Sequence, residues 1–306
     1  MPIPHRYAAA FKENGNLVGL ATATAASLAL LNPLPLLGAI VLEAVYLMFV
    51  PDSKWYEVRL SAKFDAEVAA KLSELRDRVF PQIHGSVKEQ FTRLQMARDQ
   101  IGQQSRSEEK WFREALRKLD FLMEKYLQFA LKESQFIRYL NGLIDGVYDA
   151  LTREEKNKLD NLVNRATSRH KASSPAETVV GPEPSEDWNN TICEVLSGHY
   201  DDEIAEIRER AEREEVFATK SILEKRIEIL TRRKEFVDRI LQILNNLRHQ
   251  MQLMTDTFGL INDEIRARSP EQVLADIDEV VNTANSLTEA IEAVTPLEQL
   301  VATPTF

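Results

Sequence analysis

The chain has 306 residues, of which 44% are hydrophobic and 28% are charged, a composition that excludes both a disordered chain and one lying wholly within a membrane. Its 10 Gly and 12 Pro are too few for the frequent turns of an all-β sandwich or barrel. A formal net charge of −10 argues against general nucleic-acid binding, and a single cysteine, Cys193, excludes an intramolecular disulfide framework.

Residues 17–50 form an apolar stretch with only one charged side chain, Glu43. The sequence Asn32-Pro33-Leu34-Pro35 divides it into two arms, because proline removes a backbone donor and disfavours a helix at the preceding residue. Each arm, at about 1.5 Å per residue, measures roughly 22–25 Å, against roughly 30 Å of bilayer hydrocarbon. The sequence therefore predicts an N-terminal apolar helical hairpin that inserts deeply into lipid, or two short transmembrane helices in a thinned bilayer.

The composition of the two arms favours a membrane location. Small residues are frequent in the first arm and allow two helices to approach closely. Aromatic residues at and beyond the end of the second arm are of the type found at the lipid–water boundary, and Glu43 is expected to extend toward that boundary. Basic residues lie on both outer flanks and the turn is uncharged, which predicts that both ends remain in the cytoplasm. The predicted membrane hairpin comprises Leu17, Leu20, Leu28, Leu31, Pro33, Pro35, Ile40, Glu43, Val45, Phe49 and Trp55.

The alternative interpretation of this stretch is a hairpin buried within a soluble bundle, with Glu43 bonded to a hydroxyl or a backbone donor.

Apolar residues at spacings of three and four predict long helices in the rest of the chain. The first runs from Asp52 to about Phe80, where Pro81 ends or kinks it, and a second run ends near Gly102. A third helix begins at residues 107–110 and continues to Leu151. Thr152-Arg153-Glu154-Glu155 resembles a capping box and predicts a further helix to about Ser168.

The second half of the chain has the same helical character. Gly198 is an expected interruption, but nothing forces a stop from Asp201 to Ile265, which predicts an elongated bundle or an antiparallel coiled coil. Residues 269–272 restart a helix, and Pro296 and Pro304 predict a loose tail. The predicted helix-packing seam comprises Leu116, Met123, Ile137, Ile144, Leu223, Leu230, Val237, Leu244 and Met251.

The expected fold class is thus all-α, an apolar hairpin followed by a multihelical bundle. The expected domains are the hairpin with its flank (1–51), the first half of the bundle (52–170) and the second half (188–306). Residues 171–187 contain three Pro and one Gly, and predict either a linker between the halves or an ordered loop within one domain.

Motifs for catalysis or cofactor binding are not found. The glycine-rich nucleotide loops and the H-E-x-x-H metal motif do not occur, and no histidine follows a glutamate by three positions. Cys193 and His199 alone are a weak metal pair, and a buried small hydrophobe explains Cys193 better. Acidic residues flank the basic clusters, which favours ion pairs over phosphate binding. The sequence therefore predicts no enzyme, no cofactor, no metal, no nucleic acid and no small-molecule substrate.

The favoured hypothesis is a membrane-anchored helical scaffold or assembly protein, with most of the chain in the cytoplasm. Its expected partners are membrane lipid and either further copies of itself or another helical protein. Two alternatives remain open. One is a membrane-perturbing, pore-forming-like protein whose hairpin inserts on activation, and the other is a soluble cytoplasmic oligomer with the hairpin buried.

Overall fold

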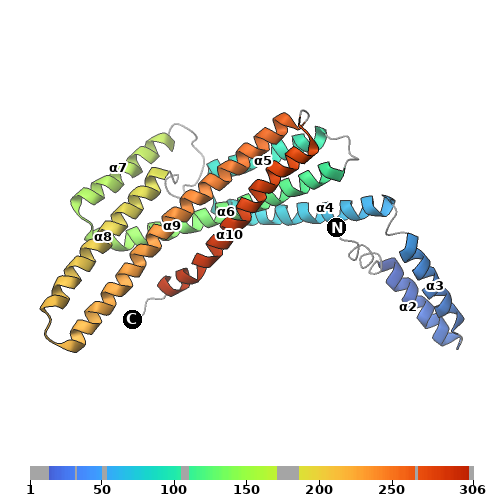
Figure 1. Cartoon of the computed structure of the whole chain (residues 1–306), viewed down its shortest axis with the longest axis horizontal. Coiled ribbons are helices and arrows are strands. Elements are labelled where there is room, and N and C mark those ends of the chain that lie inside the picture. Colours follow the sequence, from blue (N-terminus) through green and yellow to red (C-terminus); the bar gives the residue numbers. More distant parts are fainter. Residues whose placement is uncertain are drawn as a thin grey trace. The chain divides into compact units, whose positions relative to one another are not determined.

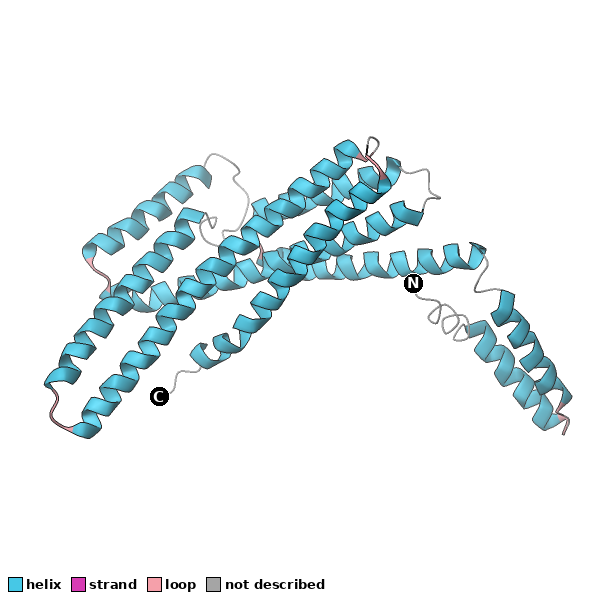
Figure 2. Ribbon diagram, viewed as in Figure 1, coloured by secondary structure: helices cyan, strands magenta, loops and turns pink. Residues whose placement is uncertain are grey.

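The computed structural model describes residues 14–31, 33–49, 54–104, 110–170, 186–265 and 268–302. Within these ranges the chain forms nine α-helices and two short 3₁₀ helices, without a β-strand, so the all-α expectation is confirmed (Figures 1 and 2). Contacts divide the chain into two compact units, residues 1–71 and 72–306. The division falls inside one helix, α4 (Lys54–Val79).

The first unit contains a pair of helices of equal length. Helix α2 (Asn14–Ala29) and helix α3 (Leu34–Phe49) each have 16 residues and pack against one another. Among the described helices, none combines the length and the apolar character needed to cross a membrane. The predicted transmembrane helix is therefore not found, because the turn at Pro33 leaves each arm at about 24 Å.

The second unit is a helical bundle. Its helices are α5 (Gly85–Gln104), α6 (Lys110–Val147), α7 (Arg153–His170), α8 (Glu186–Arg213), α9 (Phe217–Glu264) and α10 (Pro270–Ala302). Two 3₁₀ helices, η1 (Phe80–Gln82) and η2 (Tyr148–Ala150), follow α4 and α6. Helices α6 and α9 both contact α5, α8 and α10 as well as each other, and α7 packs on α8. The two long helices α6 and α9 are therefore the centre of the bundle.

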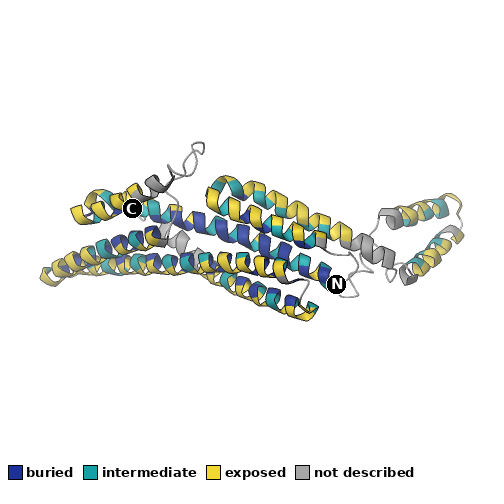
Figure 3. Ribbon diagram, turned by 90° about the horizontal axis from the view of Figure 1, so that it is seen from above, coloured by how far each residue is buried: buried dark blue, intermediate teal, exposed yellow. Residues whose placement is uncertain are grey.

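Aromatic and aliphatic side chains from several helices form one continuous core in the bundle. Tyr126, Phe129 and Phe136 on α6 are fully buried, as are Phe91 on α5 and Phe258 on α9. Figure 3 shows the buried positions as stripes along the bundle helices, whereas the hairpin positions whose burial is described are intermediate or exposed. Because burial of each large apolar side chain contributes about 1.5–3 kcal/mol, this core stabilises the bundle and not the hairpin.

Two predicted helix starts are confirmed by their capping hydrogen bonds. The Thr152 hydroxyl accepts from the backbone N–H of Glu155 at 3.3 Å, and the Glu155 carboxylate accepts from the backbone N–H of Thr152 at 2.8 Å. Ser269 and Gln272 bond reciprocally in the same way at the start of α10, each at 3.4 Å, with Pro270 at the first helical position.

Three helix boundaries differ from the sequence expectation. Helix α8 continues through Gly198, because a single glycine costs a helix only about 1 kcal/mol and the residues around it pack into the core. Helix α10 continues through Pro296 to Ala302, so the loose tail expected at Pro296 is wrong. Pro304, and residues 171–185 of the predicted linker, lie outside the described residues.

The third difference is a chain reversal within the expected run from Asp201 to Ile265. Helix α8 ends at Arg213 and α9 begins at Phe217, so the two helices form an antiparallel pair (Figure 1). Val216 is extended (φ −80°, ψ 111°) and its N–H donates to the Glu214 side chain at 2.9 Å. This short link replaces a glycine or proline turn, and it lets the apolar stripes of α8 and α9 face each other.

Candidate functional site

The hairpin of α2 and α3 is the candidate site, and its turn is tight. Leu30 N–H donates to the Ala26 carbonyl at 3.0 Å, and Leu31 N–H donates to the Leu28 carbonyl at 3.4 Å. Leu31 has φ 47°, in the left-handed region that costs a residue with a Cβ roughly 1–2 kcal/mol. Its side chain is 93% exposed at the apex of the hairpin. The reversal is thus made by an exposed leucine in a strained conformation.

The N-terminus of α3 takes a hydrogen-bond acceptor from α2. Leu36 N–H donates to the Ser27 hydroxyl at 2.9 Å, and Leu37 N–H donates to the Pro33 carbonyl at 3.0 Å. Pro35, directly before Leu36, has no N–H. The first turn of a helix normally leaves backbone donors for water to satisfy. Here Ser27 replaces water at one of these donors and also fixes the register of the two helices.

The hydroxyl groups of two threonines on α2 are satisfied within their own helix. The Thr22 hydroxyl lies 2.8 Å from the Val18 carbonyl and 2.9 Å from the Gly19 carbonyl, and the Thr24 hydroxyl donates to the Leu20 carbonyl at 2.7 Å. In a medium without water, each unsatisfied polar group costs several kcal/mol. These two threonine hydroxyls therefore meet the requirement for entry into lipid without further partners.

The outward surface of the hairpin is apolar. Ten large apolar side chains of α2, α3 and their turn are exposed, and they include both sides of the apex. These are Val18, Leu28, Leu30, Leu31, Leu34, Leu37, Ile40, Val41, Leu42 and Val45. Water contact with so many neighbouring apolar side chains is unfavourable, and a large patch of this kind marks an interaction surface.

Glu43 lies on the face of α3 that is turned toward α2. It is half-buried, as are Leu36, Ala39 and Tyr46, which share its helix face at spacings of three and four. The Glu43 Oε1 atom is shielded from solvent and has no hydrogen-bond partner among the described residues. The sequence favours a Glu43 side chain that extends to the membrane boundary, whereas the structure turns one of its oxygens inward.

The predicted hairpin residues occupy different environments. Leu28, Leu31, Pro33, Ile40 and Val45 are exposed, whereas Leu20 and Glu43 are half-buried. The side chains of Leu17, Pro35, Phe49 and Trp55 lie outside the described part of the structure. Sequence reasoning missed Ser27, whose only signal is a hydroxyl one and a half turns before the prolines.

The predicted packing seam lies in the bundle. Met123, Ile137 and Ile144 of α6 are buried, and so are Leu230, Val237, Leu244 and Met251 of α9. Leu116 and Leu223 are half-buried and pack against the core. The structure distributes these residues over two central helices that contact each other as well as α8 and α10, so they belong to a multihelical core.

Cys193 is buried in the bundle core. Burial, with a smaller contribution from the charge of Asp238, raises the pKa of the thiol from 9.0 to about 12. The thiol is therefore protonated at neutral pH, which disfavours nucleophilic chemistry because the thiolate is the reactive form. Within the described ranges, no three His, Cys, Asp or Glu side chains converge in an arrangement that could hold a metal ion.

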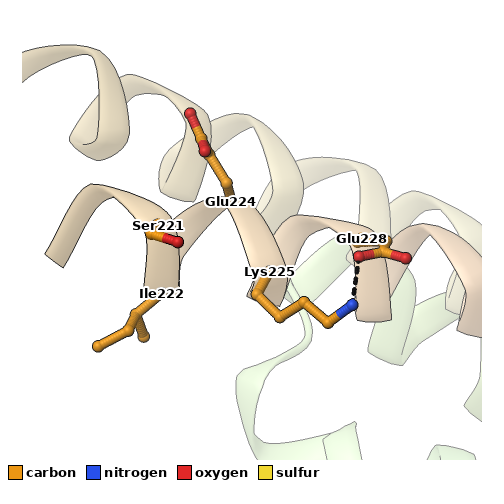
Figure 4. Close-up of a pocket in the computed structure, with 5 residues that line it drawn as sticks. All are labelled: Ser221, Ile222, Glu224, Lys225 and Glu228. Atoms are coloured by element: carbon orange, nitrogen blue, oxygen red, sulfur yellow. Dashed lines mark hydrogen bonds and ion pairs between the residues drawn. The ribbon is translucent and has the colours of Figure 1, made fainter. Parts of the chain in front are cut away.

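A surface hollow lies near the beginning of α9 (Figure 4). Its lining residues are Ser221, Ile222, Glu224, Lys225 and Glu228, all from this one helix. Lys225 and Glu228 form an exposed ion pair at 2.6 Å, and the Ile222 side chain points away from that pair. A hollow lined by one exposed helix does not enclose a ligand, so we do not treat it as a small-molecule site.

Comparisons of the chain with family models, curated proteins and solved structures returned no match.

Proposed function

We propose that the chain is a membrane-anchored helical scaffold in which the α2–α3 hairpin inserts into lipid and the helical bundle binds a partner. The observation that carries the proposal is the combination of a largely apolar outer surface with Thr22, Thr24 and Ser27 hydroxyls that are hydrogen-bonded within the hairpin. The exposed Thr22 and Thr24 hydroxyls bond to carbonyls of their own helix, and the Ser27 hydroxyl accepts from the Leu36 N–H. The two threonine hydroxyls therefore do not depend on water for a hydrogen bond.

The apolar surface supplies enough free energy for insertion. Transfer of the ten exposed apolar side chains into hydrocarbon contributes on the order of 10 kcal/mol. The one charged side chain, Glu43, opposes insertion by roughly 3 kcal/mol if it enters as a carboxylate. The balance favours lipid, and the apex around Leu31 leads the insertion.

The length of the helices supports insertion from one side. With 16 residues each, α2 and α3 reach about 24 Å into a hydrocarbon layer of about 30 Å. Both ends of a hairpin lie on the same side of the layer, so α4 and the bundle follow on the side from which the hairpin enters. We place that side in the cytoplasm, because Lys or Arg residues lie on both flanks of the hairpin and its turn is uncharged.

The proposed partner of the bundle is a second copy of the chain or another helical protein. The end of the α8–α9 pair supports this part of the proposal, because Val216, Phe217 and Ile222 are exposed there and Phe217 is 86% exposed. Measurement of the molecular mass in detergent, for the wild type and for Phe217→Ser, tests self-association at this end. A monomeric wild type would leave only a different helical protein as the partner.

Flotation of the full chain with vesicles of neutral phospholipid tests the anchor. We expect the wild type to float with the vesicles and to resist extraction by high salt. Leu28→Asp and Val45→Asp each place a charge on the lipid-facing surface and should lower the bound fraction about tenfold or more. The matched control is Met96→Asp, at a 53% exposed apolar position of α5, which should bind as the wild type does.

Three outcomes distinguish the hypotheses. A wild type that stays in the aqueous fraction as an oligomer would overturn the anchor and favour a hairpin buried between copies. Release of an entrapped dye on binding would favour the membrane-perturbing alternative. Binding without leakage, lost in Leu28→Asp and kept in Met96→Asp, supports the anchor.

A further inference from the structure

One oxygen of the Glu43 carboxyl group, Oε1, is shielded from solvent on the inner face of the hairpin and lacks a hydrogen-bond partner within the described residues. Helix α2 is the element packed on this face, and residues 14–29 contain no ionisable side chain. On α3 itself, the other titratable side chain is the phenol of Tyr46, one turn away.

We propose that the hairpin enters lipid with Glu43 protonated, so that each insertion takes up one proton from the solvent. The inference rests on the proposed membrane anchor and deepens it by naming how insertion is regulated. A carboxylate with no cation beside it is strongly disfavoured in hydrocarbon, and neither helix of the hairpin offers a cation within residues 14–49. The neutral carboxylic acid is the form that lipid accepts.

Proton uptake has a quantitative consequence. If the bound form carries one proton more than the free form, the logarithm of the partition coefficient falls with a slope of about −1 per pH unit. This holds wherever the carboxyl group is ionised in water and protonated in lipid. Lowering the pH therefore strengthens binding about tenfold per unit within that range.

The test is partition of the full chain into neutral phospholipid vesicles between about pH 5 and about pH 7.5, the range in which ordinary carboxyl groups are ionised in water. Neutral lipid removes the effect of the negative charge of the protein on the binding. We expect a slope of about −1 for the wild type and about zero for Glu43→Gln, which should bind at pH 7.5 at least tenfold more tightly than the wild type.

Two further variants complete the design. Glu67→Gln removes an exposed carboxyl group on α4 and should keep the wild-type slope. Glu43→Met, a second neutral replacement, should give a slope of about zero, as Glu43→Gln does. Circular dichroism at each pH verifies that the helices are retained.

Equal slopes in the wild type and both Glu43 variants would overturn the proton coupling while leaving the anchor intact. Failure of all variants to bind at every pH would overturn both the anchor and the coupling.

Discussion

Arg248 of α9 donates through Nε to Glu133 Oε1 of α6 at 2.7 Å, and this pair joins the two central helices of the bundle. The side chain of Glu133 is only 8% exposed. Burial raises the pKa of Glu133 above its ordinary value, and the hydrogen bond and the charge of Arg248 partly offset that increase. The carboxylate therefore depends on Arg248 for its charged form, and the pair holds α6 and α9 in one register.

Removal of one member of this pair should destabilise the bundle. Arg248→Met leaves the Glu133 carboxylate buried without its partner and should lower the free energy of unfolding by about 3 kcal/mol, as measured by urea denaturation. The double variant Glu133→Leu/Arg248→Met should recover most of this loss.

The control for Arg248→Met is Arg226→Met, which breaks an exposed pair with Glu203 and should cost less than about 1 kcal/mol. A single variant Arg248→Met as stable as the wild type would show that the pair does not hold the helices together.

Cys193 should make the stability of the chain depend on alkaline pH. Its pKa is raised from 9.0 to about 12 in the folded state, so the unfolded chain releases this proton first. Stability from this group is fully present below about pH 9 and is lost as the pH rises toward about 12, by at most about 1.4 kcal/mol per unit. Urea denaturation of the wild type and Cys193→Ala should give a difference in stability that shrinks over this range.

The tyrosines of the bundle titrate at high pH in both proteins and cancel in that difference. A difference that stays constant with pH would mean that the Cys193 thiol is as accessible in the folded chain as in the unfolded one.

Replacement of Gly198 by alanine should stabilise α8. A Cβ atom at this position would lie 3.7 Å from the Glu155 Oε1 atom, which is an ordinary contact distance. Alanine in the interior of a helix is favoured over glycine by roughly 0.5–1 kcal/mol. Thermal unfolding of Gly198→Ala should show a correspondingly higher Tm, and Gly142→Ala, in open space on α6, should give a similar gain. A lower Tm for Gly198→Ala alone would indicate that α8 is interrupted at this residue.

Ser27 should matter to the hairpin in lipid. Ser27→Ala leaves the Leu36 N–H without its acceptor, and in hydrocarbon that loss costs about 1–2 kcal/mol, or about tenfold in vesicle partition. A decrease in vesicle partition is informative, because alanine is more apolar than serine and would strengthen vesicle binding if the hydrogen bond did not matter. Thr24→Ala is the matched control, since the Thr24 hydroxyl bonds only to a carbonyl of its own helix. Equal partition of both variants would show that the Ser27 hydrogen bond is not needed.

The helices of the bundle could be predicted from the sequence because their signals are local. Pro81 at the end of α4, the Thr152 box before α7 and Ser269 before α10 each act through neighbouring backbone groups. The apolar spacing along α6 and α9 likewise follows from helix geometry alone. Each of these features depends only on residues within a few helical turns of one another.

Features that depend on two distant segments were not predictable in the same way. The reversal at Val216 contains neither glycine nor proline, and it is favoured only because α8 and α9 cover each other's apolar stripes. Its one local signal is the pair of acids, Glu214 and Glu215, where the apolar spacing would otherwise continue. The Ser27–Leu36 bond and the inward turn of Glu43 similarly depend on how α2 meets α3.

The backbone at Leu31 shows what the apex of the hairpin is adapted for. Glycine would relieve the left-handed conformation at φ 47°, and the cost of keeping leucine there is roughly 1 kcal/mol. The apex of the hairpin therefore carries a large apolar side chain that is almost fully exposed. At the tip, an unfavourable backbone conformation is therefore accepted in exchange for an exposed apolar side chain. Leu31→Gly would relieve the backbone strain and stabilise the turn, but it would remove the apolar side chain that contacts an apolar surface first.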